Sequence, residues 1–116
     1  MLPKKNRLTK KGDFERVSSK GNYFSFQNIS LKTTSNNSSF PRIGFSIGKK
    51  ISVKAINRNQ IKRVLRESFQ EHLPKIAEGV DIVVYFKKDN QSEKLIDSKK
   101  TAARVEKLLK KANLIQ

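Results

Sequence analysis

The sequence of 116 residues has no cysteine, no tryptophan and a single histidine, His72. Without cysteine there is no disulfide, thiolate metal site or cysteine nucleophile, and one histidine cannot form a histidine cluster around a metal. No hydrophobic run approaches the length of a membrane span. No apolar signal region follows the basic first residues. We therefore expect a soluble, cytoplasmic protein that holds no metal of its own.

Acidic residues are scarce, with 10 Asp and Glu against 26 Lys and Arg, which gives a net charge of +16. So much positive charge on a small chain repels itself unless a polyanion compensates it. Nucleic acid is the usual polyanion, because displacing counterions from phosphates supplies affinity that does not depend on sequence. An anionic membrane surface is the competing partner. It is less favoured because the apolar stripe of the basic segment is explained more simply as a core face.

Apolar residues make up 35% of the chain, and the seven Phe, the two Tyr and the clear periodic segments favour a folded protein over a disordered one. The length suits a single domain over residues 1–116, with a short basic arm at residues 1–8. A first helix is predicted over residues 10–19, with Thr9 as its N-cap and Asp13 in its first turn. We expect Gly21 to end this helix in the left-handed conformation.

Residues 23–34 alternate as a strand does, which places Phe24, Phe26 and Lys32 on one side. Residues 35–39 form a polar loop, and residues 41–47 form a second strand that we expect to pair with the first as a hairpin. Residues 80–87 are almost continuously apolar, as in an inner strand buried on both faces. A polar turn is predicted at residues 88–93.

Two further helices follow from apolar residues spaced three and four apart. The central helix begins at Ala55 or Asn57 and ends near Leu73, before Pro74. The last helix begins with Asp97 or Ser98 as its cap. The predicted fold is α+β, a central mixed sheet packed by helices in the order α-β-β-(β)-α-β-α.

Residues 49–67 carry the densest positive charge, and the first part of the central helix lies within them. At 100° per residue, Asn59, Lys62, Arg63 and Arg66 fall within an arc of about 100° beside the apolar stripe. Guanidinium groups match phosphate geometry and Lys supplies a point charge, so this ridge suits RNA. Arg58 lies nearer the apolar side, where we expect it to reach an edge of the sheet or to pack its aliphatic stem. The predicted RNA-binding residues are Lys49, Lys50, Lys54, Arg58, Asn59, Lys62, Arg63 and Arg66.

Aromatic side chains on a sheet beside cations often stack the bases of single strands. Most aromatic residues of a small chain belong to its core, but an exposed sheet face would let some of them line a groove. The predicted groove residues are Phe14, Phe24, Phe26 and Lys32. No paired-carboxylate site, phosphate-binding loop or Ser/His/Asp arrangement emerges, so we expect no catalytic residue in this chain.

Several motifs of the sequence resemble those of a known family. The stretch 44–50, Gly-Phe-Ser-Ile-Gly-Lys-Lys, is followed at 54–67 by Lys-Ala-Ile-Asn-Arg-Asn-Gln-Ile-Lys-Arg-Val-Leu-Arg-Glu. Together with Arg7-Leu8, Asp13-Phe14 and the final stretch 108–111, Leu-Leu-Lys-Lys, they resemble the bacterial ribonuclease P protein component. The resemblance implies a left-handed βαβ crossover and a two-layer sandwich similar to a ribosomal-protein domain.

The resemblance also implies a function, which is to serve as the protein subunit of a ribonucleoprotein. The particle cleaves the 5′ leader from precursor tRNA, and its RNA performs catalysis with Mg²⁺. The implied partners are the catalytic RNA and the 5′ leader, with no membrane and no obligate protein partner. Lys54, Arg58, Asn59, Lys62, Arg63 and Arg66 match the RNA-contacting motif, and Phe14 marks the leader cleft. Two positions depart from the family pattern: Gln60 replaces an Arg, and Ser18 replaces a second cleft aromatic.

Two other classes of protein remain open at this point. A structural RNA-binding ribosomal protein would explain the charge, although such proteins more often carry long basic extensions than a short arm. A nonspecific DNA-compacting protein is a more distant alternative. Cleavage of precursor tRNA in a reconstituted particle distinguishes the leading interpretation from both.

Overall fold

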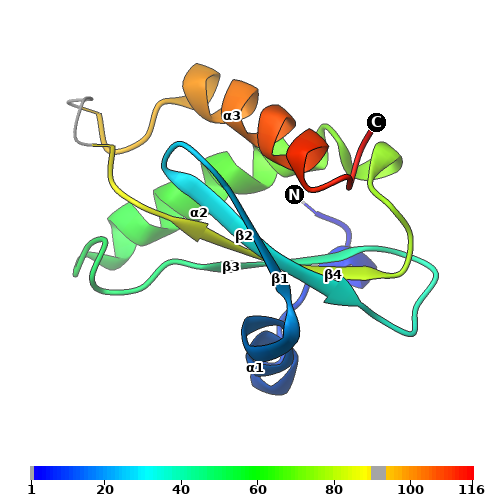
Figure 1. Ribbon diagram of the computed structural model, residues 1–116. Coiled ribbons are helices and arrows are strands. Elements are labelled where there is room, and N and C mark those ends of the chain that lie inside the picture. The colour runs from blue at the N-terminus through cyan, green and yellow to red at the C-terminus, as the bar shows by residue number, and fades with distance from the viewer. Residues whose placement is uncertain (1, 90–93) are drawn as a thin grey trace.

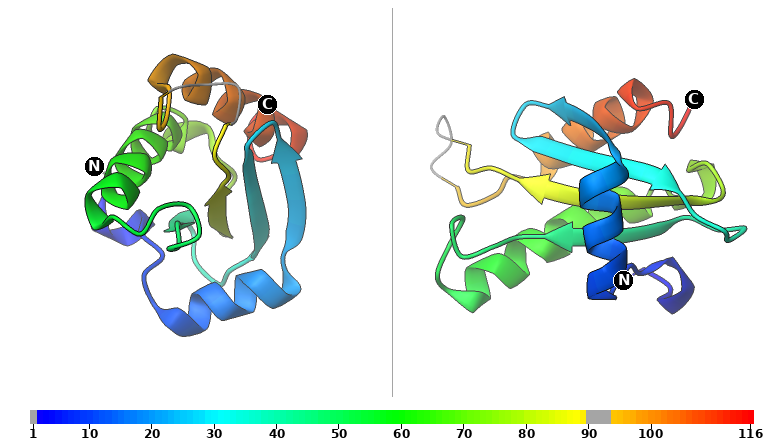
Figure 2. Two further views of the ribbon diagram at one scale, coloured as in Figure 1. Left: turned by 90° about the vertical axis from the view of Figure 1, so that its left-hand side faces the viewer. Right: turned by 60° about the horizontal axis from the view of Figure 1, so that its bottom comes forward.

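A computed structural model describes residues 2–89 and 94–116 (Figure 1). A four-stranded sheet carries one helix on one face and two helices on the other (Figures 1 and 2). The elements, in chain order, are α1 (Lys11–Lys20), β1 (Asn22–Phe26), β2 (Ile29–Ser35), β3 (Arg42–Ser46), α2 (Ala55–Gln70), β4 (Val80–Phe86) and α3 (Ser98–Lys111), with short 3-10 turns at Lys4–Asn6 and Leu73–Lys75. The α+β class and the order of helices and strands are confirmed. The predicted turn at residues 88–93 lies mostly outside the described residues.

The sheet has the strand order β1-β2-β4-β3, so β4 is the inner strand that its continuous apolar run predicted. It pairs antiparallel with β2 and parallel with β3. The parallel pair makes β3-α2-β4 a βαβ unit. Viewed from α2 with both strands pointing up, β4 lies to the left of β3, so the crossover is left-handed (Figure 2).

The predicted strand at residues 23–34 is in fact two strands. β1 and β2 form an antiparallel hairpin in which Phe24 pairs with Leu31 and Tyr23 pairs with Lys32. The chain reverses at Gln27, whose φ of 55° is left-handed and which gave no glycine or proline signal. Since Lys32 lies opposite Tyr23, it faces away from Phe24 and Phe26, and the prediction that these three residues share a side is wrong.

The predicted hairpin between residues 23–34 and 41–47 is also wrong, because β4 lies between β2 and β3. Residues 36–41 therefore cross the start of β4 and do not form a hairpin loop. Two backbone-directed contacts hold this crossing: the Asn36 amide donates to Gly79 O at 2.7 Å, and Asn6 Nδ2 donates to Pro41 O at 2.7 Å.

The main core lies between the sheet and the layer formed by α2 and α3. One face of the sheet contributes Leu31, Ile82 and Val84, which are fully buried. Phe45 of β3 meets Phe69 of α2 edge to face, with 5.9 Å between ring centroids. α2 ends at Gln70, three residues earlier than predicted. This layer and the sheet form the predicted two-layer sandwich.

Helix α1 adds a partial third layer on the opposite face, where Val17 and Leu8 pack with Val83. Asp13 lies in the first turn of α1 as predicted, but the N-cap is Lys10 and not Thr9. Gly21 follows the helix with φ −74°, so the predicted left-handed ending is wrong. Glycine is needed there because the chain passes close to the end of α1, where a Cβ would lie 2.5 Å from Val17 O.

Residues 2–8 were predicted as a basic arm, and they are docked along β3. Leu2, Asn6 and Leu8 are buried. The Leu8 amide donates to Ile43 O at 3.0 Å, and Arg7 forms an isolated bridge with Ile43. The start of the chain is therefore fixed beside the groove described next.

Candidate nucleic-acid interface

The cations predicted to bind RNA lie on α2 and on the loop before it. Lys54 is the N-cap of α2, no side chain caps this end, and no acidic residue stands in its first turn. The positive end of the helix dipole is therefore uncompensated and adds to the charge of the side chains. Among the residues that the structure describes, no ion pair engages Lys49, Lys50, Lys54, Lys62, Arg63 or Arg66.

Arg58 is placed differently from the other cations. We expected it to reach an edge of the sheet or to pack its stem, but its guanidinium turns back toward the preceding loop. Nη1 donates to Ser52 O and to Val53 O, at 2.9 Å each. Both carbonyls are within reach of Nη1 because the loop curls over the start of α2. The prediction of a sheet-edge position is wrong, and part of the guanidinium is already engaged within the protein.

Lys62 and Arg66 lie half-buried along the wall of a groove of about 310 Å³. The groove runs between residues 2–9, β3 and α2. Its lining residues are Leu2, Arg7, Leu8, Thr9, Phe14, Ile43, Gly44, Phe45, Lys62 and Arg66. Arg7 adds a third cation, which sequence reasoning did not assign to a site, although Arg7-Leu8 was part of the family resemblance. Asn59 and Arg63 are exposed on α2, outside this lining.

Phe14 of α1 forms the shared wall between this groove and a second one of about 480 Å³. The second groove lies between α1 and the sheet, and its lining residues are Phe14, Glu15, Ser18, Ser19, Ser46, Val83 and Tyr85. The Phe14 ring lies over Gly44, where a Cβ would stand 2.4 Å from Cζ of the ring. Ser18, the position that departs from the family pattern, lines this second groove. Tyr85 was missed because its continuous apolar strand gave no sign of which side chains line a groove.

The other predicted groove residues are separated by the sheet. Phe24 and Phe26 face the main core beside α3, and Lys107 Nζ lies 5.4 Å from the centroid of the Phe26 ring. Lys32 lies on the α1 side, where its Nζ donates to Ser18 O at 2.7 Å. The structure therefore brings Phe14 and Lys32 to the same face and places Phe24 and Phe26 on the other.

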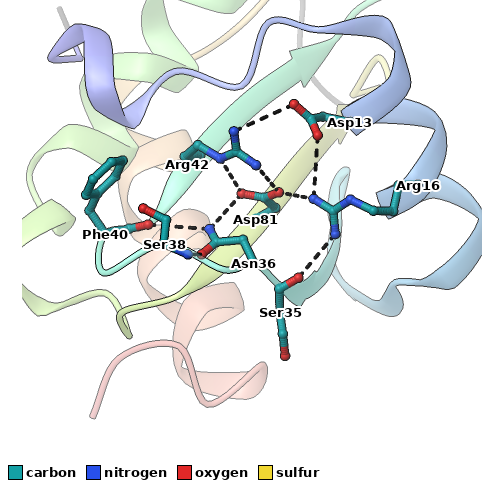
Figure 3. Close-up of polar contacts among 8 residues, drawn as sticks. All are labelled: Asp13, Arg16, Ser35, Asn36, Ser38, Phe40, Arg42 and Asp81. Carbon is teal, nitrogen blue, oxygen red and sulfur yellow. Dashed lines mark hydrogen bonds and ion pairs between the residues drawn. The ribbon is translucent and has the colours of Figure 1, made fainter.

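A network of charges links α1 to β3 and β4 (Figure 3). The fully buried Asp81 carboxylate accepts from Arg42 Nε and Nη2 at 2.8 Å each, from Asn36 Nδ2 at 2.8 Å, and from Arg16 Nη2. Asp13 is 3.6 Å from Arg42 and 3.8 Å from Arg16. Burial by itself would raise the pKa of Asp81, but these hydrogen bonds and charges together hold it below its ordinary value.

Side chains that bind metals are not clustered in the part of the chain that the structure describes. Within residues 2–89 and 94–116, no cluster of three His, Asp or Glu side chains could hold a metal ion. Besides apolar side chains and Glu15, the groove walls carry cations, aromatics and hydroxyls, which suit phosphate, base and ribose contacts. No helix within the described ranges is long and apolar enough to cross a membrane.

Comparisons with known proteins agree with the geometry. The ribonuclease P family model matches residues 2–113. The ribonuclease P protein component of Dictyoglomus turgidum is 32% identical over 115 residues, covering 99% of this chain and 95% of the relative. A mutant of the Staphylococcus aureus RNase P protein superposes with a TM-score of 0.82 at 31% identity, covering 97% of this chain and 92% of that one. The Thermotoga maritima RNase P protein superposes with a TM-score of 0.79 at 29% identity, covering 90% of this chain and 96% of that one. This chain therefore belongs to the ribonuclease P protein component family.

Proposed function

We propose that this chain is the protein subunit of a ribonuclease P particle in which an RNA cleaves the 5′ leader from precursor tRNA. The protein binds the catalytic RNA through α2 and the loop before it, and it holds the leader beside Phe14. The observation that carries the proposal is a set of cations that form no ion pair with any described residue and that continue into the wall of the groove at Lys62 and Arg66, in a chain of this family. Such a particle works where precursor tRNA is made, which places it in the cytoplasm.

The exposed part of α2 suits the backbone of a large RNA. Arg63 and Asn59 project from the helix, and Lys49, Lys50 and Lys54 surround its positive end. Charged hydrogen bonds to phosphate oxygens fix orientation without reading sequence. Of the predicted RNA-binding residues, Arg58 alone is committed to backbone carbonyls of the protein, so we assign it to support of the loop.

The groove of about 310 Å³ suits a single strand better than a duplex. It offers the Phe14 ring for stacking and Arg7, Lys62 and Arg66 for phosphates, which together are the usual elements of a single-strand site. Phe24 and Phe26 face the core, so we withdraw them from the leader site. Lys32 lies on the correct face but is bonded to the end of α1, so we assign it to holding α1.

The Mg²⁺ that the particle needs is held by the RNA in this proposal. The groove of about 310 Å³ is lined by cations and by apolar side chains, and these do not fit a magnesium site, which takes carboxylate, phosphate and water oxygens. The protein contributes by binding the leader and the catalytic RNA at once, which lowers the Mg²⁺ concentration needed for the substrate to bind. No catalytic step is assigned to its side chains.

Reconstitution tests the proposal. The protein is mixed with a bacterial ribonuclease P RNA and with precursor tRNA at low Mg²⁺, and cleavage and binding are measured. We expect the protein to restore cleavage and to tighten binding of leader-bearing precursor more than of mature tRNA. The Lys62→Ala and Phe14→Ala variants should lose most of this preference. Lys75→Ala is the matched control, since Lys75 is exposed beyond the opposite end of α2. Equal binding of precursor and mature tRNA by the wild-type protein would refute leader binding.

A further inference from the structure

The loop before α2 and the first turn of α2 each present one apolar side chain to solvent in the middle of the cations. Val53 is 78% exposed and Ile56 is 75% exposed. Single exposed apolar residues are ordinary. These two are three positions apart, on either side of the N-cap Lys54, and the charge around them is all positive. We call Val53 and Ile56, together with the loop at residues 47–54, the α2 tip.

The α2 tip is held in place by several contacts. Ile51 packs against the main core, and its amide donates to Gly48 O at 3.1 Å. Ser52 Oγ accepts from the Lys54 amide at 3.2 Å and from Asn57 Nδ2 at 3.1 Å. Arg58 then fixes the carbonyls of Ser52 and Val53. A surface that is ordered in advance loses less conformational entropy when a partner covers it.

The surroundings of the α2 tip select the partner. Lys49, Lys50 and Lys54 flank the apolar pair and form no ion pair with any residue that the structure describes. Cations without partners call for a polyanion, which excludes a neutral protein surface or a second copy of this basic chain. Among polyanions, RNA with unpaired nucleotides also offers uncharged faces of bases and riboses.

We propose that Val53 and Ile56 form a nonionic contact with bases or riboses of unpaired nucleotides, in the RNA whose phosphates the surrounding cations bind. The inference rests on the proposed function, since that RNA is the catalytic RNA. The contact assigns positioning roles to Arg58 and Asn57, which hold the α2 tip. It also gives this surface an affinity term that salt does not screen, because burial of apolar area releases no counterions.

The test is a salt titration of binding between the full chain and a bacterial ribonuclease P RNA. The Val53→Thr/Ile56→Thr double variant keeps both β-branches and therefore the local backbone preference. We expect it to bind roughly tenfold more weakly, which is about 1.4 kcal/mol, with an unchanged slope of log affinity against log salt. Lys54→Ala should instead reduce that slope by about one. Ile56→Leu, which keeps the apolar surface, should bind as the wild type does.

The outcomes are distinguishable. A wild-type protein that does not bind the RNA would refute the proposed function itself. If the wild type binds and the double variant binds equally well, only the nonionic contact is refuted. A loss of slope as large as that of Lys54→Ala would show that the variant disturbed phosphate contacts, which also refutes it. Self-association of the wild type, measured by sedimentation, is a further test. If the double variant abolishes self-association while RNA affinity stays constant, the nonionic contact with RNA is also refuted.

Discussion

Asp81 carries its charge on a side chain that the protein covers completely, while its partners Arg16 and Arg42 remain 33% and 28% exposed. Three side chains from three separate segments donate to its two oxygens, and Asp13 closes the network from α1 (Figure 3). A buried charge is costly unless it is paired and fully hydrogen-bonded. The network therefore works as a clamp that fixes α1, and with it Phe14, at one distance from the sheet.

Replacing Asp81 with Asn should destabilise the protein and loosen α1. Breaking a buried pair typically costs about 3–5 kcal/mol, and we expect a smaller loss, about 2–3 kcal/mol, because both guanidinium groups keep contact with water. Urea unfolding at pH 7 measures the change. Glu78→Gln removes an exposed carboxylate just before β4, so it serves as a control that changes the net charge by the same amount without touching the buried oxygens. A free energy of unfolding within about 0.5 kcal/mol of wild type, the range of an ordinary surface substitution, would contradict the clamp.

The same carboxylate predicts an acid dependence. The pKa of Asp81 is lowered in the folded protein, so its contribution is complete above the unfolded pKa of about 3.9 and is lost as the pH falls through the folded pKa. The wild type should lose this part of its stability in acid, and Asp81→Asn cannot. We therefore expect the stability gap between the two proteins to shrink below about pH 4. If the stability difference between the two proteins stays constant down to the pH of acid unfolding, the charge of Asp81 is not its cause.

Gly44 shows how one missing side chain shapes the groove. A Cβ there would meet the Phe14 ring at 2.4 Å and Leu8 O at 2.9 Å. Gly44→Ala should cost about 1–3 kcal/mol through overpacking. In the Phe14→Leu background the added cost should fall, because the ring is gone, although the Leu8 carbonyl keeps some of it. A double-mutant cycle from urea unfolding measures the coupling between the two positions. If the two changes in the free energy of unfolding are strictly additive, contact with the Phe14 ring is not the source of the cost.

At the scale of single residues, sequence reasoning succeeded where one side chain determines local geometry. Asp97 caps α3 as predicted, and its carboxylate accepts from the Lys100 amide at 3.0 Å. It failed at Gly21 and Arg58, whose roles depend on neighbours that the fold supplies. A close approach to Val17 O and a curled loop over α2 leave no trace in residue type or spacing.

At the scale of elements, the helices could be predicted because each carries its own apolar stripe. The hairpin could not, because residues 23–34 alternate continuously through a turn at Gln27-Asn28 that has no glycine or proline. Because this turn was missed, Lys32 was placed on the same side as Phe24 and Phe26. The predicted groove therefore contained two aromatic residues that belong to the core. The α2 cations were assigned correctly to one helix, and their proximity to Phe14 depends on the tertiary fold.

The support of the α2 tip by Arg58 is an element-scale prediction. Both carbonyls accept from Arg58 Nη1, and a lysine side chain is shorter and ends in a more strongly hydrated ammonium, so Arg58→Lys should loosen the loop while preserving charge. We expect faster amide hydrogen exchange at Val53 and Lys54 with no change in global stability, since a few loop contacts set local opening. Arg63→Lys, on the exposed side of α2, is the control. Wild-type exchange rates at both amides in Arg58→Lys would mean that the loop holds its shape without the guanidinium.

At the scale of the whole molecule, the α+β class followed from the mixture of periodic segments, but the strand order did not. β4 inserts between β2 and β3 because its residues are apolar on both faces and can be covered from both sides, by α2 and α3 on one and by α1 on the other. Sequence neighbours suggested pairing β2 with β3. The choice between these arrangements depends on burial summed over the whole sheet, which no local pattern contains.

The net charge of +16 predicts that salt acts in opposite directions on folding and on binding. Screening relieves the repulsion among the protein's own cations, so raising NaCl should increase the free energy of unfolding modestly. The same salt competes with phosphates. If about six phosphates are neutralised, RNA affinity should fall roughly a thousandfold between about 50 and 200 mM salt. Denaturant unfolding and RNA titration at matched salt concentrations measure both quantities.

A matched variant separates the two effects. Lys75 and Lys99 are exposed and lie outside the proposed interface, so replacing both with Gln lowers the net charge without removing a phosphate contact. This variant should gain less stability from salt than the wild type, and its RNA affinity should keep the wild-type slope. A reduced slope would place Lys75 or Lys99 within the bound region and enlarge the interface. Salt that lowers both stability and affinity would show that the folded protein depends on its ion pairs more than it suffers from its excess charge.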